Sequence, residues 1–214
     1  PFFFFTHKTA YEMLRSLVGS EMCIRDRYNK GETFWDRFVV RVAPAENNLP
    51  YREASRINIH RDTWGTNLYQ QINWWAPVSN VEEKNTMIFY PDYFDVPVKN
   101  TTSTWDLNIY LANRKKGDFS YPSAPQLKED LPSNINKIPV TIKPGEILCF
   151  SGAHLHSSSK EKSENTRISF EIRTICENDL NSSAQAPNVD CDLQWKFPKI
   201  FKKINDNSPL KITS

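Results

Sequence analysis

The sequence predicts a mainly β fold, an antiparallel sandwich or jelly roll with long loops and few helices. Several short segments are rich in β-branched and aromatic residues, as strands are. Residues 167–175 alternate between polar and apolar side chains, which is the period of a strand with one face buried. The chain holds 14 prolines but only 6 glycines, which suits stiff connections between short strands.

The candidate strands lie between stretches of turn-forming residues. Residues 34–42 fit either a strand or a short helix. The further candidates are residues 57–60, 68–78, 86–90, 138–142, 146–150 and 167–175. Lys143, Pro144 and Gly145 form a turn signal, so we expect the strands on either side of them to pair as a hairpin. We expect long irregular segments over residues 91–137 and after residue 178.

Length and composition indicate one globular domain. The chain has 214 residues, and its hydrophobic content of 39% and aromatic content of 13% exclude global disorder. Its 27 basic and 25 acidic residues give no basis for attraction to nucleic acid or a membrane surface. We therefore expect no nucleic-acid or membrane partner and leave the oligomeric state open. The four cysteines lack a CxxC pair, which is typical of reduced thiols in a cytoplasmic protein.

The first 27 residues differ in character from the rest. Residues 8–27 (KTAYEMLRSLVGSEMCIRDR) resemble the translated adapter read-through found in some transcriptome and metagenome assemblies. The alternative is a native helix over residues 11–18 that ends at Gly19. We expect residues 1–27 to be a non-native leader and residues 28–214 to be a single jelly-roll domain that lacks its native N-terminus.

A metal site is predicted around the pattern His60-Arg61-Asp62. Side chains at i and i+2 of a strand point to the same face, so His60 and Asp62 can reach one metal ion. A third ligand must come from His154 or His156, which are also two residues apart. Two imidazoles and one carboxylate are the ligand set that holds non-haem Fe(II) while leaving coordination positions open. A lone H-x-D pattern is more often a surface pair or a hydrogen-bonded core pair.

The second histidine segment carries a family resemblance. Residues 144–159 (PGEILCFSGAHLHSSS) resemble the second signature of the phytanoyl-CoA dioxygenase family. That signature has proline–glycine, an apolar strand, a glycine turn, then a histidine, a small residue and a serine. The resemblance covers residues 57–94 and 138–175. It implies a double-stranded β-helix, a cupin-like jelly roll, in which iron is held by the catalytic residues His60, Asp62 and His156.

The same resemblance implies that 2-oxoglutarate is the cosubstrate. Arg167, 11 residues after His156, would bind its distal carboxylate, with help from Ser158. Ser169 shares a face with Arg167 by strand alternation. The alternative for Arg167 is a surface salt bridge with Glu164 or Glu171, and Arg173 is a weaker candidate for the carboxylate.

Two polar residues interrupt the otherwise apolar segment 68–78. Gln71 and Asn73 could contact 2-oxoglutarate or the substrate. Equally, each could hydrogen-bond to a neighbouring backbone group.

The sequence therefore predicts an Fe(II)- and 2-oxoglutarate-dependent dioxygenase. It would use O2 to hydroxylate a C–H bond of a small organic substrate, releasing succinate and CO2. Asp62 favours hydroxylation, because related halogenases lack this carboxylate. Thr86 stands where the family has glycine, and residues 92–94 replace its Gly-Ser-His, so the substrate is left unassigned. The alternative is a non-catalytic jelly-roll protein that binds a metal or another ligand, or an inactive fragment of such an oxygenase.

Overall fold

The computed structural model describes residues 3–5, 31–45, 57–159, 161, 163–182 and 184–212. Its strands are β1 (Phe3–Phe5), β2 (Thr33–Trp35), β3 (Val39–Ala43), β4 (Ile72–Pro77), β5 (Met87–Phe89), β6 (Ile138–Pro139), β7 (Ile147–Ser151), β8 (His156–Ser158), β9 (Arg167–Cys176) and β10 (Lys202–Lys203). Its α-helices are α4 (Thr63–Thr66), α5 (Leu107–Lys115) and α6 (Glu177–Asn181). Short 3-10 turns lie at Glu83–Asn85, Pro91–Tyr93 and Pro198–Ile200.

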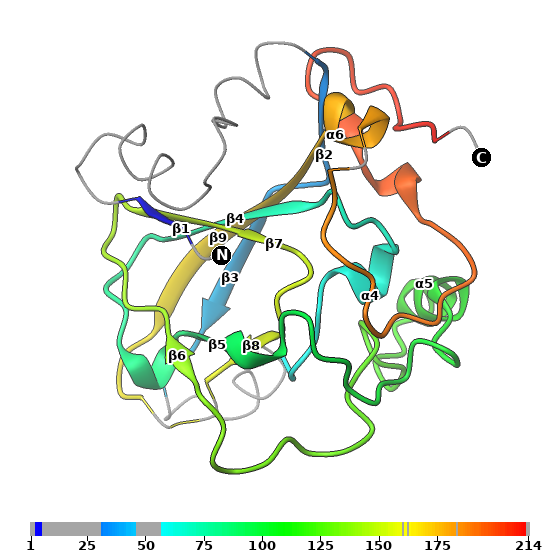
Figure 1. Ribbon diagram of the computed structural model, residues 1–214. Coiled ribbons are helices and arrows are strands. Elements are labelled where there is room, and N and C mark those ends of the chain that lie inside the picture. The colour runs from blue at the N-terminus through cyan, green and yellow to red at the C-terminus, as the bar shows by residue number, and fades with distance from the viewer. Residues whose placement is uncertain are drawn as a thin grey trace.

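Within the described residues the strands form two antiparallel sheets. The larger sheet has the order β1–β7–β4–β9–β2–β10, and β3 also pairs with β9. The smaller sheet has the order β6–β5–β8. Figure 1 shows the larger sheet across the upper part of the molecule and the smaller one below it. These two sheets and the few short helices confirm the predicted mainly β, jelly-roll fold class.

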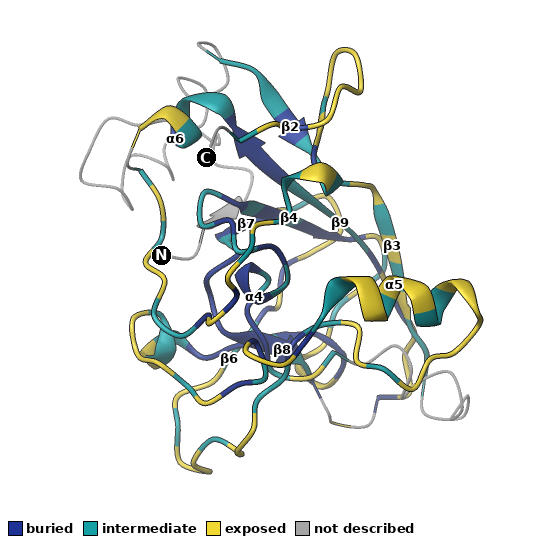
Figure 2. Ribbon diagram, turned by 90° about the vertical axis from the view of Figure 1, so that its right-hand side faces the viewer, coloured by how far each residue is buried: buried dark blue, intermediate teal, exposed yellow. Residues whose placement is uncertain are grey.

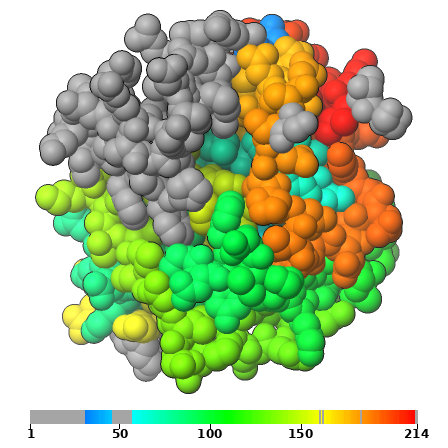
Figure 3. Space-filling model, in the orientation of Figure 1, coloured from blue at the N-terminus to red at the C-terminus, as the bar shows by residue number. Residues whose placement is uncertain are grey.

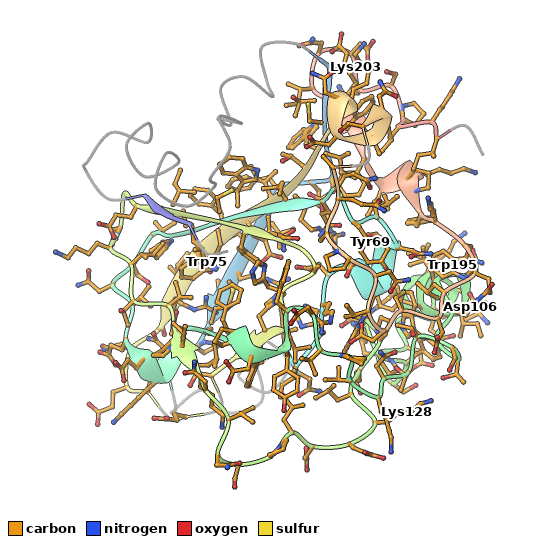
Figure 4. The ribbon with its side chains drawn as sticks, in the orientation of Figure 1. Tyr69, Trp75, Asp106, Lys128, Trp195 and Lys203 are labelled. Carbon is orange, nitrogen blue, oxygen red and sulfur yellow. The ribbon has the colours of Figure 1, made fainter. Side chains whose placement is uncertain are left out.

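The main core lies between the two sheets. Trp75 of β4 packs with Leu148 and Phe150 of β7 against Met87 and Phe89 of β5. Trp75 is fully buried and projects into the space between the sheets (Figure 4). Figure 2 shows buried residues along the facing strands, whereas α5 lies outside them and is largely exposed. Full burial of one large apolar side chain stabilises a fold by about 1.5–3 kcal/mol, so this cluster anchors the two sheets to each other.

Strand β9 presents polar side chains to this interior and apolar ones to the outside. Arg167 and Ser169 are buried, while Ile168, between them in sequence, is 38% exposed. On the same outer face, Phe170 packs against Phe38 with ring centroids 5.2 Å apart. Burying polar groups costs free energy unless they find partners. The buried polar side chains of β9 therefore indicate that this interior binds a polar or charged group in addition to forming the core.

Two of the predicted strand arrangements need correction. Residues 57–60 form no extended strand: only His60 bridges to a partner, His156. The predicted hairpin over residues 138–150 is wrong, because β6 pairs with β5 whereas β7 pairs with β4 and β1. The turn at Gly145, where φ is 93°, carries the chain from the smaller sheet to the larger one. A turn signal fixes a local reversal, but it does not decide which sheet each arm joins.

The segment 91–137, predicted to be irregular, contains helix α5. Asp106 begins this helix, since its carboxylate accepts hydrogen bonds from the backbone N–H groups of Asn108 and Ile109. The predicted boundary after residue 27 lies outside the described residues. In the described part of the chain, no helix is long and apolar enough to cross a membrane.

Candidate metal centre

Three side chains from two separate segments of the fold converge between the sheets. One ligand atom from each of His60, Asp62 and His156 lies within 4.8 Å of the others. The backbones of His60 and His156 exchange two hydrogen bonds, of 2.9 and 3.0 Å. This pairing places both imidazoles side by side at the end of β8. The cluster contains His156 and not His154, whose ring packs against Phe94 with centroids 4.6 Å apart.

Backbone carbonyl groups fix how both imidazoles are protonated. His60 Nδ1 lies 2.8 Å from the carbonyl oxygen of Asn58, and His156 Nδ1 lies 2.9 Å from that of His154. A carbonyl can only accept, so each Nδ1 donates and each neutral ring has its lone pair on Nε2. These Nε2 atoms face Asp62 at 3.7 and 3.6 Å. Three electron-rich atoms that converge in this way can coordinate one cation.

The electrostatics of the cluster keep its ligands in their metal-binding forms. Burial lowers the pKa of His156 to about 4, so the ring is neutral near pH 7. Burial also acts to raise the pKa of Asp62, but the hydrogen bond and positive charge that the two imidazoles provide once they are protonated in acid, together with the charge of Arg173, outweigh this effect. The pKa of Asp62 is thus held well below its usual range. Metal ligands must be deprotonated to bind, and both groups meet this requirement.

Amide groups of β4 and its preceding turn orient Asp62. Asn73 donates from Nδ2 to Asp62 Oδ2. Gln71 Nε2 donates to Asn73 Oδ1 over 2.9 Å, and the Thr66 hydroxyl donates to Gln71 Oε1 over 3.2 Å. The Thr66 hydroxyl fixes the orientation of the Gln71 amide. The Gln71 amide in turn fixes the orientation of the Asn73 amide. Partners of this kind, one step behind the metal ligand, hold its geometry. A contact of either amide with 2-oxoglutarate stays a prediction.

Gly152 makes room for this chain of hydrogen bonds. A Cβ atom at this position would stand 2.6 Å from Gln71 Nε2. The backbone N–H of Gly152 also donates to the carbonyl of Gln71 over 3.1 Å. This hydrogen bond connects the turn that precedes His154 and His156 to the start of β4.

Arg167 lies buried without a carboxylate partner. Its Nη1 donates to Ser169 Oγ over 3.2 Å, and its guanidinium stands 5.4 Å from the centre of the Trp75 ring. Its Nε is buried with no hydrogen-bond partner. Among the described residues neither Glu164 nor Glu171 forms a salt bridge with it. Ser158 lies at the far end of β8, where its Oγ accepts from the backbone N–H of Ile57, which leaves the hydroxyl free to donate.

Arg173 is committed to another partner. Its Nε and Nη2 both lie 2.6 Å from Asp36 Oδ2, and its Nη1 lies 3.8 Å from Asp62 Oδ1. Arg173 therefore stabilises the ionised carboxylate of Asp62, while Asp36 occupies two of its three nitrogen atoms.

The middle residue of the His60-Arg61-Asp62 pattern joins three segments. Arg61 is 2% exposed and donates to Asp190 Oδ2 over 3.1 Å and to the carbonyl of Ala153 over 2.5 Å. It also donates to three carbonyls of one loop, those of Tyr93, Phe94 and Val96. Figure 3 shows this green loop meeting the orange C-terminal segment on the surface. This role could not be predicted from the sequence, because no local pattern distinguishes a buried arginine from an exposed one.

The cavity at the cluster is small. Its wall includes the salt bridge between Arg41 and Glu171, which was not predicted from the sequence. The cavity has a volume of about 30 Å³ and is lined by the three candidate ligands, Asn73, Arg41 and Glu171. This volume suits an ion or very few water molecules. Arg41 was detectable as the single charged residue in the apolar strand VVRVA.

Comparison with known proteins gives limited similarity. No protein-family model matches the chain, and no curated protein matches it significantly in sequence. Among solved structures, EvdO2 from Micromonospora carbonacea var. aurantiaca complexed with 2-oxoglutarate has a TM-score of 0.47 and 10% identity, covering 82% of this chain and 66% of that one. The non-heme monooxygenase ThoJ in its apo form has a TM-score of 0.46 and 14% identity, covering 79% and 52%.

A third structure is SnoN, described as a non-heme alpha ketoglutarate dependent epimerase from nogalamycin biosynthesis. It has a TM-score of 0.40 and 13% identity, covering 68% of this chain and 50% of that one. The chain thus spans about half to two thirds of the length of these three proteins. Similarity at this level does not define an activity, so we base the function on the metal centre itself.

Proposed function

We propose that this protein is an Fe(II)- and 2-oxoglutarate-dependent oxygenase. It hydroxylates a C–H bond of a small organic substrate in the cytoplasm and releases succinate and CO2. The observation that carries the proposal is the convergence of two Nε2 lone pairs and one ionised carboxylate, from His60, His156 and Asp62. Two imidazoles and one carboxylate suit non-haem Fe(II) and leave positions for reactants.

The charges around the cavity support a doubly negative cosubstrate. In the described part of the chain, four charged residues besides the histidines line the cavity, namely Arg41, Arg173, Asp62 and Glu171; Asp36 is paired with Arg173, and Arg167 interacts electrostatically with Arg41 and Glu171. Their charges cancel, so a divalent ion adds two uncompensated positive charges. Buried charges without partners cost several kcal/mol each. A dicarboxylate such as 2-oxoglutarate restores neutrality, whereas a monoanion does not.

Arg167 supplies the anchor for one end of such a ligand. The residue is 4% exposed, and its buried Nε has no partner. An unsatisfied buried donor costs about 1–3 kcal/mol, which a carboxylate ligand would recover through charge-assisted hydrogen bonds. Arg167 donates a hydrogen bond to Ser169, and this bond keeps the guanidinium group over the ring of Trp75.

The chemistry would be shared between the iron and the protein. Bound iron would supply the reaction with O2, in which 2-oxoglutarate gives succinate and CO2 and one oxygen atom enters a substrate C–H bond. The residues of the chain would hold the iron and orient the reactants around it. Asn73 fixes Asp62, and the apolar side chains of Trp75, Met87 and Phe150 line the cavity and exclude water from it.

The direct test is binding and turnover in the presence of iron. We expect Fe(II) and 2-oxoglutarate under anaerobic conditions to give a visible charge-transfer absorption, and O2 to release succinate. The Asp62→Ala variant should lose both signals, whereas Asp130→Ala, which removes an exposed carboxylate, should keep them. Undiminished succinate release by Asp62→Ala would overturn the assignment. Absence of both signals in the unaltered protein would favour the alternative, a non-catalytic jelly-roll binding protein or inactive fragment.

A further inference from the structure

Arg41 reaches the metal cavity from the neighbouring strand. It lies on β3, where it pairs in register with Ser169 of β9. Its side chain lines the cavity together with His60 and Asp62. Its Nη2 donates to Glu171 Oε1 over 2.5 Å, and Glu171 lines the same cavity.

Arg41 and Arg167 are two neighbouring guanidinium groups with unused donors. The Nε atoms of both are buried and have no hydrogen-bond partner among the described residues. Burial and the charge of Arg41 lower the pKa of Arg167 to about 10. Two like charges and two orphaned donors are unfavourable in a buried region unless an anion joins them.

The third arginine is already paired. Arg173 is held by Asp36 through Nε and Nη2, both 2.6 Å from Oδ2, and its Nη1 faces Asp62 at 3.8 Å. Among the described residues, Arg41 and Arg167 are the arginines of these two strands whose buried Nε atoms have no hydrogen-bond partner. They come from adjacent strands, and Arg41 lines the cavity that holds the metal ligands.

The present cavity, with a volume of about 30 Å³, has room for an ion or very few water molecules but not for a five-carbon dicarboxylate. The Arg41–Glu171 pair is part of its wall. Neither side chain is fully buried: their exposed fractions are 35% and 25%. The pair can therefore open without disturbing the core.

We propose that Arg41 leaves Glu171 when the cosubstrate enters and, with Arg167, clasps its distal carboxylate. This inference rests on the proposed function, since it names a further binding residue for 2-oxoglutarate. In this role Glu171 competes with the ligand for Arg41. The alternative explanation is that the Arg41–Glu171 salt bridge only stabilises the pairing of β3 with β9.

The two explanations predict opposite effects for the two halves of the pair. If Arg41 clasps the ligand, Arg41→Gln should weaken 2-oxoglutarate binding about tenfold or more, the value of one charge-assisted contact. Glu171→Gln should leave the affinity unchanged or increase it, because it removes the competitor. If the pair is only a brace, both variants break it and both should weaken binding alike.

The experiment measures dissociation constants on Co(II)-loaded protein without O2, for 2-oxoglutarate and for 2-oxopentanoate, which lacks the distal carboxylate. Arg41→Gln should reduce the preference for 2-oxoglutarate over 2-oxopentanoate, whereas exposed Arg37→Gln should not. Arg41→Lys, which keeps the charge, should lie in between and serves if the glutamine variant does not fold. Co(II) affinity is measured for each variant first, so that every 2-oxoglutarate constant refers to fully metal-loaded protein.

Several results would overturn the clasp. One is an equal loss for Arg41→Gln and Glu171→Gln, and another is an equal loss for both ligands in Arg41→Gln. Normal 2-oxoglutarate affinity in Arg41→Gln would refute the clasp and leave the proposed function standing. Unaltered protein that binds Co(II) but not 2-oxoglutarate would refute the proposed function itself.

Discussion

The amide of Asn73 donates a hydrogen bond to the carboxylate of Asp62, the acidic member of the candidate metal centre. Asn73 can do so in only one orientation, because Gln71 donates to its oxygen. The ionised carboxylate is thus held in place from β4, while the segment that carries His60 and Asp62 has a single bridge to its neighbour. Strand β4 thereby supports Asp62 in addition to the backbone hydrogen bonds that its own segment makes with β8.

Replacing Asn73 with leucine should weaken metal binding by about 10- to 100-fold, the usual cost of removing a partner behind a metal ligand. Leucine has a similar volume but cannot donate to Asp62. Calorimetric titration with Co(II) measures the effect. Asn108→Leu, at an exposed position of α5, is the matched control and should bind as the unaltered protein does. Equal affinities for both variants would show that Asn73 does not position the carboxylate.

Gly152→Ala should lower both stability and metal affinity. The added methyl group would meet Gln71 Nε2 at 2.6 Å, so the amide must move and release Asn73. We expect a loss of about 1–3 kcal/mol in the free energy of unfolding, as for overpacked interiors. Gly65→Ala is the control, because no atom lies within 4 Å of its added Cβ. Urea unfolding of the two variants compares them, and equal stability would contradict the expected clash.

Arg61→Met should be among the most destabilising substitutions in the chain. It removes five hydrogen bonds and leaves the buried carboxylate of Asp190 without its charged partner. Breaking a buried pair from one side costs about 3–5 kcal/mol. Arg37→Met, at an exposed position, should cost little. A small shift in the urea midpoint of Arg61→Met would mean that these segments hold together without it.

Stability without metal should fall as the pH drops from about 6.5 to about 3. Burial lowers the pKa of His154 to about 3, from 6.5 in the unfolded chain. Between these values the unfolded state binds more protons, so acid favours unfolding by up to about 1.4 kcal/mol per pH unit. His154→Phe removes this group and should flatten the pH profile of the unfolding free energy, measured with a chelator present. His156 contributes a similar slope over a narrower window, down to about pH 4, and the variant keeps this contribution. Superimposable profiles would contradict this linkage.

The sequence by itself determined the strand content and the ligand types. Alternation in residues 167–175 predicted β9, because a half-buried strand must repeat every two residues. The spacing of His60 and Asp62 predicted that both could reach one ion, and the structure brings them together with His156. These features depend on neighbours one or two residues apart, which a sequence displays directly.

Only the tertiary structure decided what stands behind the ligands. Residues 138–150 read as a hairpin, yet its two arms join different sheets, because pairing is settled by the whole sheet and not by the turn. Arg61, Asn73 and Arg41 acquire their roles from partners far away in the chain, such as Asp190, Asp62 and Glu171. Burial and long-range hydrogen bonds arise when the sheets close on each other, so no local pattern can contain them.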